Sequence, residues 1–137
     1  MKRKIPLLMK IVAIAAVCLV AGFFAIMEGI RALAEHTEAE YKGIKTVDIS
    51  AIPDGDYGGK AGAFLCSSDL TVTVRDHQIT DIKINREVNG GGKYRAEDIY
   101  PRMIKAQSPM VDTVSGATLT SKTVMVAVYK ALTNWDK

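Results

Sequence analysis

Hydrophobic residues follow three different patterns along the chain. Residues 11–27 form an unbroken apolar run, which is at the short end of the length range for a membrane-spanning helix. Over residues 70–84 apolar and polar positions alternate, which predicts two strands joined into a hairpin at Asp76–His77. Over residues 121–133 apolar residues recur every three or four positions, which predicts a helix with one buried face. That face consists of Val124, Ala127, Val128, Ala131 and Leu132.

Weaker signals lie between these elements. Residues 53–59 are rich in Pro, Asp and Gly and predict a turn that leads into a further strand. Residues 96–107 predict a helix with Pro101 in its first turn and with Met103 and Ile104 facing the sheet. The glycine-rich stretch 89–93 lacks the spacing of a Walker phosphate loop, so we expect a flexible loop there. These elements predict an α+β fold, a small, mainly antiparallel sheet packed with helices and preceded by one N-terminal transmembrane helix.

Charge around the apolar run predicts how it is oriented. Four basic residues precede the run, and Glu28, Glu35, Glu38 and Glu40 follow it. The positive-inside rule therefore places the N-terminus in the cytoplasm and the remaining chain outside it, in a single-pass protein of the cell membrane. The small-x-small sequence 32–34 leaves a cleaved signal peptide as the alternative. We expect a cytoplasmic basic segment at 1–10, a transmembrane anchor at 11–30, a juxtamembrane spacer at 31–50 and a folded domain at 51–137.

The net charge of +3 comes from the basic N-terminus, because residues 31–137 contain fourteen basic and fourteen acidic side chains. No basic stripe with interspersed aromatic residues remains, so nucleic-acid binding is not expected. Cys18 lies in the apolar run and Cys66 in the domain, on opposite sides of a membrane boundary, so we expect no disulfide between them. We expect Cys66 to be a small, half-buried side chain.

A cluster of small and hydroxylated residues precedes the C-terminal helix. Residues 112–118 read Asp-Thr-Val-Ser-Gly-Ala-Thr, and Thr120 or Ser121 is the expected N-cap of that helix. The unpaired N–H groups and the positive dipole end of a helix start favour phosphate. Gly116 permits close backbone approach to a ligand, and Thr118 presents a hydroxyl beside the anion site. The residues alone therefore predict a phosphate near Thr118.

The sequence Asp-x-x-Ser-Gly-Ala-Thr resembles the flavinylation motif of the FMN-binding domain family. This family includes the periplasmic flavin subunits of sodium-pumping and Rnf-type respiratory complexes. The resemblance implies that Thr118 carries FMN through a phosphoester bond, attached by a separate flavin transferase that uses FAD. It further implies that residues 51–137 are an FMN-binding domain. The matching cofactor-binding positions are Asp112, Ser115, Gly116, Ala117 and Thr118, with Thr120 and Ser121 fitting the sequence that follows.

The resemblance extends to both flanks of the motif. Asp54, Gly55, Tyr57 and Gly59 match an Asp-Gly-x-Tyr-x-Gly element that opens the domain in relatives. Relatives usually have Asp-Gly at the hairpin turn where this chain has Asp76–His77. Because histidine tolerates positive φ better than most residues, we expect this departure to affect turn stability more than function.

No catalytic set is visible, because the histidines, His36 and His77, lie beside the membrane segment and in a turn. No metal-ligand motif is present either. The leading hypothesis is an extracytoplasmic electron carrier that shuttles electrons between membrane or extracellular redox partners, with the bilayer as its tether. One alternative is a binding or accessory module of a membrane redox complex that carries no flavin. The other is a flavin-dependent reductase component.

Overall fold

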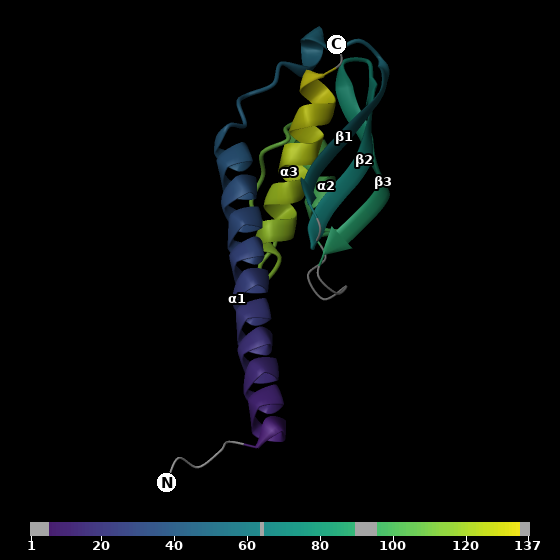
Figure 1. The fold of residues 1–137 in the computed structure, drawn as a ribbon. Coiled ribbons are helices and arrows are strands. Elements are labelled where there is room, and N and C mark those ends of the chain that lie inside the picture. The colour runs from purple at the N-terminus through teal and green to yellow at the C-terminus, as the bar shows by residue number, and fades with distance from the viewer. Residues whose placement is uncertain (1–5, 64, 90–95, 135–137) are drawn as a thin grey trace. The chain divides into compact units, whose positions relative to one another are not determined.

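The computed structural model describes residues 6–63, 65–89 and 96–134, and the predicted loop at 89–93 therefore falls almost entirely outside them. Contacts divide the chain into two compact units, residues 1–32 and 33–137. Figure 1 shows the order of the elements along the chain. They are helix α1 (Leu7–Lys42), the 3-10 turn η1 (Ile49–Ala51), strands β1 (Gly55–Ala63), β2 (Cys66–Arg75) and β3 (Gln78–Asn89), and helices α2 (Ile99–Ala106) and α3 (Thr118–Thr133).

The three strands form one antiparallel sheet in the order β1-β2-β3. Leu70, Val72 and Val74 of β2 are fully buried, and the alternating residues of that strand are more exposed, as the sequence predicts. Asp76 and His77 have φ values of 50° and 58°, which is the pair of left-handed residues that a tight hairpin turn needs. The predicted hairpin and the α+β class are therefore confirmed.

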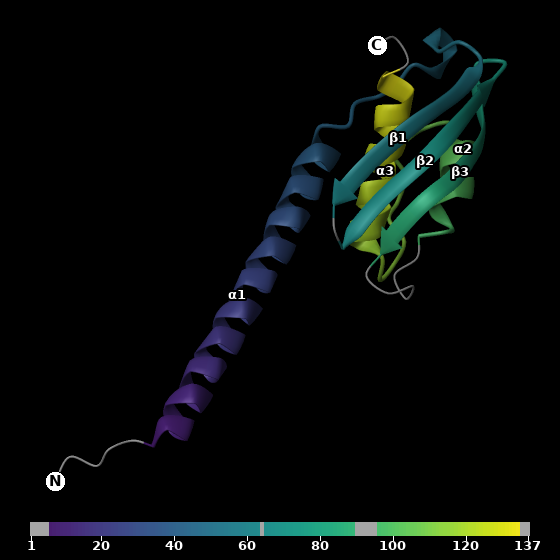
Figure 2. The same ribbon diagram turned by 45° about the vertical axis from the view of Figure 1, so that its right-hand side comes forward.

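Helices α2 and α3 cover the same face of the sheet, α3 over β1 and β2 and α2 against β3 (Figure 2). Helix α2 begins at Ile99, three residues later than predicted, with Pro101 in its first turn. Met103 is fully buried and Ile104 half-buried, as expected for the sheet-facing side. Past its end, the Gln107 side chain pairs with both backbone groups of Ile79, at 2.7 and 2.9 Å, and so caps part of the β3 edge.

Helix α3 is buried on nearly all sides. Its predicted apolar face is confirmed, but Met125 and Val126, outside that face, are buried as well. A helix that is apolar all round needs partners on two sides. The sheet supplies one, where β1 approaches so closely that a Cβ on Gly59 would lie 2.0 Å from the Ala127 carbonyl oxygen. Residues 33–42 of α1 supply the other.

Two ion pairs join α1 to α3 within the second unit. Glu38 pairs with Lys122, and Glu40 with Lys130 at 2.5 Å. Thr37 of α1 is buried, and further along the chain Ile44 and Ile49 enter the core. The segment 33–50, which the sequence analysis assigned to a spacer, thus packs as part of the compact unit.

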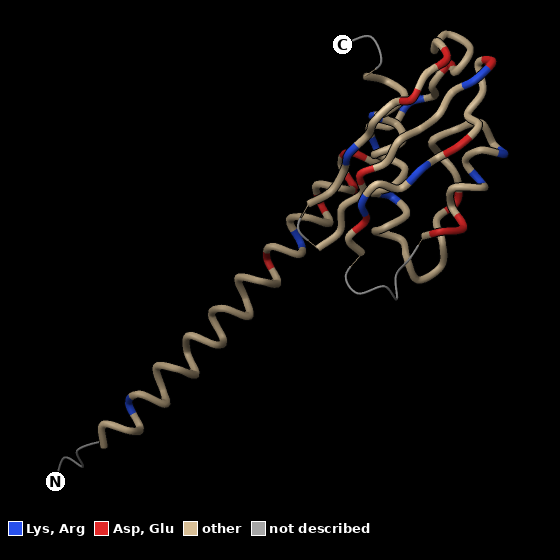
Figure 3. Tube along the Cα trace, turned by 90° about the vertical axis from the view of Figure 1, so that its right-hand side faces the viewer, with Lys and Arg blue, Asp and Glu red and all other residues tan. Residues whose placement is uncertain are grey.

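The first unit contains the whole apolar run, residues 11–27. In Figure 3 the helix carries no charged residue from 11 to 27, and its large hydrophobic side chains are exposed, Leu19 at 76% and Phe24 at 62%. The apolar stretch of α1 has a mean hydropathy of 2.5. By length and composition, α1 is therefore able to cross a membrane.

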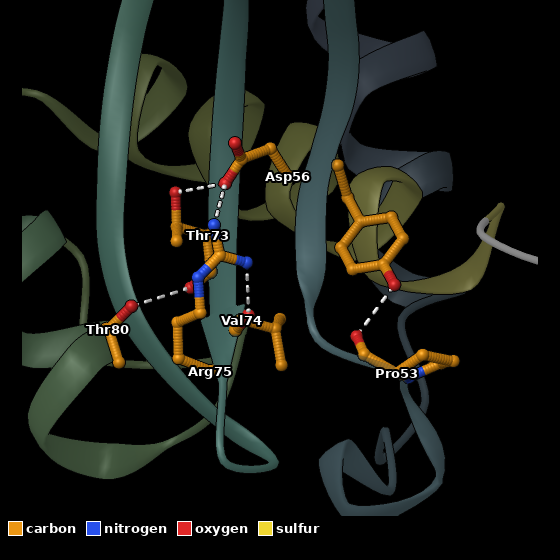
Figure 4. Close-up of polar contacts among 7 residues, drawn as sticks. Pro53, Asp56, Thr73, Val74, Arg75 and Thr80 are labelled. Carbon is orange, nitrogen blue, oxygen red and sulfur yellow. Dashed lines mark hydrogen bonds and ion pairs between the residues drawn. The ribbon is translucent and has the colours of Figure 1, made fainter.

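The sheet face opposite the helices is polar (Figure 4). Thr73 donates a hydrogen bond to Asp56 at 2.8 Å, and Arg75 lies 3.5 Å from the same carboxylate. On the other face of β1, Tyr57 packs against the core, and its hydroxyl donates to the Pro53 carbonyl at 2.7 Å. Such paired, exposed polar groups are typical of an antiparallel sheet with one face in solvent.

Candidate functional site

A tight turn places the motif against α3. The Ala117 N–H donates to the Val114 carbonyl at 3.0 Å, and Gly116 has a φ of +78°. A positive φ at the third of four residues is the hallmark of a type II turn, and glycine adopts it without strain. A Cβ on Gly116 would have no heavy atom within 4 Å, so the turn has open space beside it. Ser115 and Gly116 are exposed at its tip, whereas Ala117 is buried.

The expected N-cap is wrong. Helix α3 begins at Thr118, and its N-cap is Ala117, which has no side-chain oxygen to offer. Thr120 and Ser121 instead lie inside the first turn and are buried. The helix thus begins three residues earlier than predicted. Serine and threonine are the usual N-caps, but here the hydroxyl groups of Thr120 and Ser121 contact other parts of the domain.

The start of α3 therefore exposes unpaired donors. Among the residues that the structure describes, the first hydrogen bond of the helix runs from the Ser121 N–H to the Ala117 carbonyl at 2.8 Å. The N–H groups of Thr118, Leu119 and Thr120 have no protein acceptor in that part of the chain. Thr118 itself is exposed. An exposed hydroxyl at an uncapped helix start is an arrangement that favours a phosphate group attached there.

Buried hydroxyl groups hold the start of α3 in place on the side that faces the core. Ser121 Oγ accepts a hydrogen bond from the Val114 N–H at 3.0 Å, which ties the turn to the helix. Cys66, at the beginning of β2, places its Sγ 3.4 Å from Thr123 Oγ1 and 3.9 Å from Thr120 Oγ1. Cys66 is 5% exposed, more deeply buried than expected, and joins the sheet to the first turns of α3. Thr120 and Ser121 thus position the site from within the protein.

Lys122 is the cation nearest to Thr118 along α3. It follows Thr118 by four residues, so the two side chains leave the helix on the same side. The Lys122 ammonium group lies 4.9 Å from the centre of the Tyr41 ring and pairs with Glu38. This ammonium group is the main reason why the pKa of Glu38 is lowered. Residues of α1 therefore reach the first turns of α3.

A hollow of about 700 Å³ adjoins the motif and is called the Tyr41 hollow below. Asp112, the first residue of the motif, lies in its wall, and the Asp112 carbonyl accepts a 3.5 Å hydrogen bond from Arg102. The wall combines one aromatic ring, apolar side chains and two cations. Its residues are Tyr41, Arg102, Lys105, Ala106, Met110, Val111 and Asp112.

A second hollow, of about 570 Å³, lies along the C-terminal part of β1. Two of its three cationic side chains, Lys60 and Lys130, are paired with carboxylates, and Arg86 is the third. Lys60 pairs with Asp69 at 2.8 Å and is the first cause of the lowered pKa of that carboxyl group, and Lys130 pairs with Glu40. We call this the Lys60 hollow. Its lining includes none of the motif residues 112–118, which makes it a poorer match than the Tyr41 hollow for a group attached at Thr118.

The structure brings together some of the predicted site residues and separates others. Ser115, Gly116 and Thr118 share one exposed surface at the start of α3, and Asp112 lies in the wall of the adjoining hollow. Tyr41, Arg102, Lys105 and Lys122 were missed by the sequence analysis. Of these, only Lys122 had a signal in the sequence, its four-residue spacing from Thr118.

Groups that would indicate another chemistry lie in structural positions. His77 Nδ1 is 3.2 Å from the Ile52 carbonyl within the hairpin turn, and His36 is 3.6 Å from Glu40. The described residues contain no group of three or more His, Cys, Asp or Glu side chains able to hold a metal ion.

Comparison with known proteins agrees with the site. Residues 67–133 match the sequence model of the FMN-binding domain family, a range that contains the motif turn, α2 and α3. No curated protein and no solved structure matches the chain. The matched range ends at the last residue of α3 and leaves α1 and β1 outside it. The chain therefore carries a domain of the FMN-binding family, preceded by a helix that is able to cross a membrane.

Proposed function

We propose that this protein is a membrane-anchored, extracytoplasmic electron carrier with FMN joined to Thr118 by a phosphoester bond. The observation that carries the proposal is the position of Thr118, an exposed hydroxyl at the first residue of an uncapped helix. The family match supports FMN as the cofactor, and the motif at 112–118 supports a covalent bond at Thr118.

The residues at the start of α3 fit a phosphate. The N–H groups of Thr118, Leu119 and Thr120 are directed out of the helix end, where its dipole is positive. Open space beside Gly116 leaves room for a group attached to the neighbouring hydroxyl. The rigid turn from Val114 to Ala117 holds this arrangement before any cofactor binds, which lowers the entropic cost of holding the phosphate.

The attachment step has a simple balance. A separate flavin transferase supplies FAD, and a bond forms between Thr118 Oγ1 and the FMN phosphorus as the pyrophosphate bond breaks. AMP leaves, and the hydroxyl proton passes to a base of the transferase or to water. When bound, the flavin supplies reversible electron transfer, and the protein supplies its position and surrounding charge. A covalent bond keeps the flavin on the protein outside the cell, where a dissociated cofactor would be lost by dilution.

Charge around α1 supports the orientation. Basic residues precede the apolar run, and acidic residues follow it, so the domain would lie outside the cytoplasm. Alkaline phosphatase fused after Lys137 should be active, because this enzyme needs the oxidising compartment. Green fluorescent protein exported by the same route should be dark. Inactive alkaline phosphatase together with fluorescent green fluorescent protein would overturn the proposed orientation.

The covalent bond is tested by mass spectrometry of the full chain made together with a flavin transferase. We expect a mass increase equal to FMN minus water, lost in Thr118→Ala and kept in Thr118→Ser, which preserves a hydroxyl. Thr113→Ala, in the same segment, is the matched control and should remain loaded. Flavin still attached in Thr118→Ala would show that the acceptor is another residue. A chain that stays colourless beside an active transferase would instead favour an accessory module without flavin.

A further inference from the structure

We infer that the ring system of the FMN carried by Thr118 lies in the Tyr41 hollow, so that the juxtamembrane end of α1 forms one wall of the flavin site. This inference rests on the proposed function, because it requires flavin at Thr118. It adds Tyr41, which lies outside the matched range 67–133, as a contact of the ring and Lys105 as a determinant of its reduction potential.

A continuous series of contacts leads from Thr118 to this hollow. Lys122 lies one turn further along α3 on the same side of the helix as Thr118. Its ammonium group contacts the Tyr41 ring, and Tyr41 lies in the wall of the hollow. From the other direction, Asp112 connects the hollow to the motif turn along the backbone. Two routes, one through Lys122 and Tyr41 and one along the backbone from Asp112, therefore connect the hollow with the attachment point.

The composition of the wall suits a flavin ring. Tyr41 offers an aromatic face for offset stacking, and Met110 and Val111 offer apolar contact. Met110 is 45% exposed, so its side chain is accessible to a ring placed in the hollow. The family match, by itself, gives no reason for an aromatic residue in α1 to line this surface.

The cations of the wall suit a group that becomes more negative on reduction. Arg102 and Lys105 are exposed, and neither pairs with a carboxylate among the described residues. The wall also contains one acidic residue, Asp112, so the two cations leave an excess of positive charge. Positive charge beside the ring favours its reduced form and raises its reduction potential. In the Lys60 hollow, Lys60 and Lys130 are paired with Asp69 and Glu40 and Arg86 is the remaining cation, but no residue of the motif 112–118 lines it.

Fluorescence of the loaded full-length protein tests the contact with Tyr41. A tyrosine stacked on a flavin quenches its emission by electron transfer, so Tyr41→Leu should raise flavin fluorescence several-fold, whereas Tyr41→Phe, which keeps an aromatic face, should raise it less. The matched control is Tyr57→Leu, another half-buried tyrosine packed against the core, on β1. The flavin fluorescence of the Tyr57→Leu variant should equal that of the wild type.

The midpoint potential tests the charge. Lys105→Gln should make the potential more negative, whereas Lys83→Gln, an equally exposed lysine on β3, should leave it unchanged. Both lysines are exposed, so neither change threatens folding, and the test stands even where Tyr41→Leu folds poorly. The inference would be overturned if both variants kept their covalent flavin, Tyr41→Leu kept the wild-type fluorescence and Lys105→Gln kept the wild-type potential. That result would leave the proposed function intact. A wild-type chain without covalent flavin would overturn the proposed function itself.

Discussion

The Val114 N–H donates a hydrogen bond of 3.0 Å to the hydroxyl oxygen of Ser121, and this contact fastens the motif turn to helix α3. Seven residues separate the two partners, and the turn with Gly116 at its tip lies between them. The Ser121 side chain is fully buried, so the bond is shielded from water. The position of Thr118, directly after the turn, therefore depends on the buried hydroxyl group of Ser121.

Ser121→Ala should weaken both the fold and the flavin attachment. Loss of the hydroxyl leaves the Val114 N–H without its acceptor, which typically costs about 1–3 kcal/mol of unfolding free energy. Chemical denaturation of the full chain in detergent measures this loss, and mass spectrometry measures the loaded fraction. Thr133→Ala is the matched control, because its hydroxyl donates to the Tyr129 carbonyl near the other end of α3. Full loading of Ser121→Ala would contradict the positioning role.

Three glycine substitutions should separate backbone strain from steric overlap. Gly116→Ala should cost about 1–2 kcal/mol, because alanine is strained at a φ of +78° although space is free. Gly59→Ala should be far more damaging, since its Cβ would overlap the Ala127 carbonyl of α3. Gly58→Ala is the control, because a Cβ at Gly58 would have no heavy atom within 4 Å. Thermal denaturation should rank the losses as Gly59, Gly116, Gly58, and equal losses at Gly58 and Gly59 would contradict the observed packing.

Acid should weaken the junction between α1 and α3. The pKa of Glu38 is lowered mainly by its hydrogen bond with Lys122. A group with a depressed pKa in the fold stabilises it above the ordinary pKa, and that contribution disappears as the pH falls through the depressed value. Glu38→Gln should therefore be less stable than the wild type at neutral pH and equal to it in strong acid. Melting temperatures across this range test the point, and a constant difference would contradict it.

The end of α2 should depend on Gln107. Its side-chain amide accepts from the Ile79 N–H and donates to the Ile79 carbonyl, as a neighbouring strand would. Gln107→Ala should cost about 1 kcal/mol for each bond lost and should speed hydrogen exchange at the Ile79 amide. Gln78→Ala, an exposed glutamine on the same strand, is the control. Unchanged exchange at Ile79 would show that the bond contributes little to protection.

Local patterns in the sequence were sufficient for most elements of the domain. The alternation around Val72, the left-handed turn at Asp76–His77 and the apolar face of α3 are each set by neighbouring residues. The motif at 112–118 similarly identified the family that the comparison shows. Such features are readable because side-chain period and turn geometry act over a few residues.

The helix start and the Tyr41 hollow depend on contacts between distant parts of the chain. Propensity favours Thr120 or Ser121 as the cap, but burial against β2 and the motif turn uses their hydroxyls and moves the start of α3 to Thr118. Residues 33–50 look like a charged spacer, yet Glu38 and Tyr41 meet Lys122, which lies about eighty residues away in sequence. Local sequence determined which elements form and that the hydroxyl group of Thr118 belongs to the motif preceding the C-terminal helix. Only tertiary packing decided which side chains surround it, because those contacts arise when the hydrophobic surfaces of separate elements are buried together.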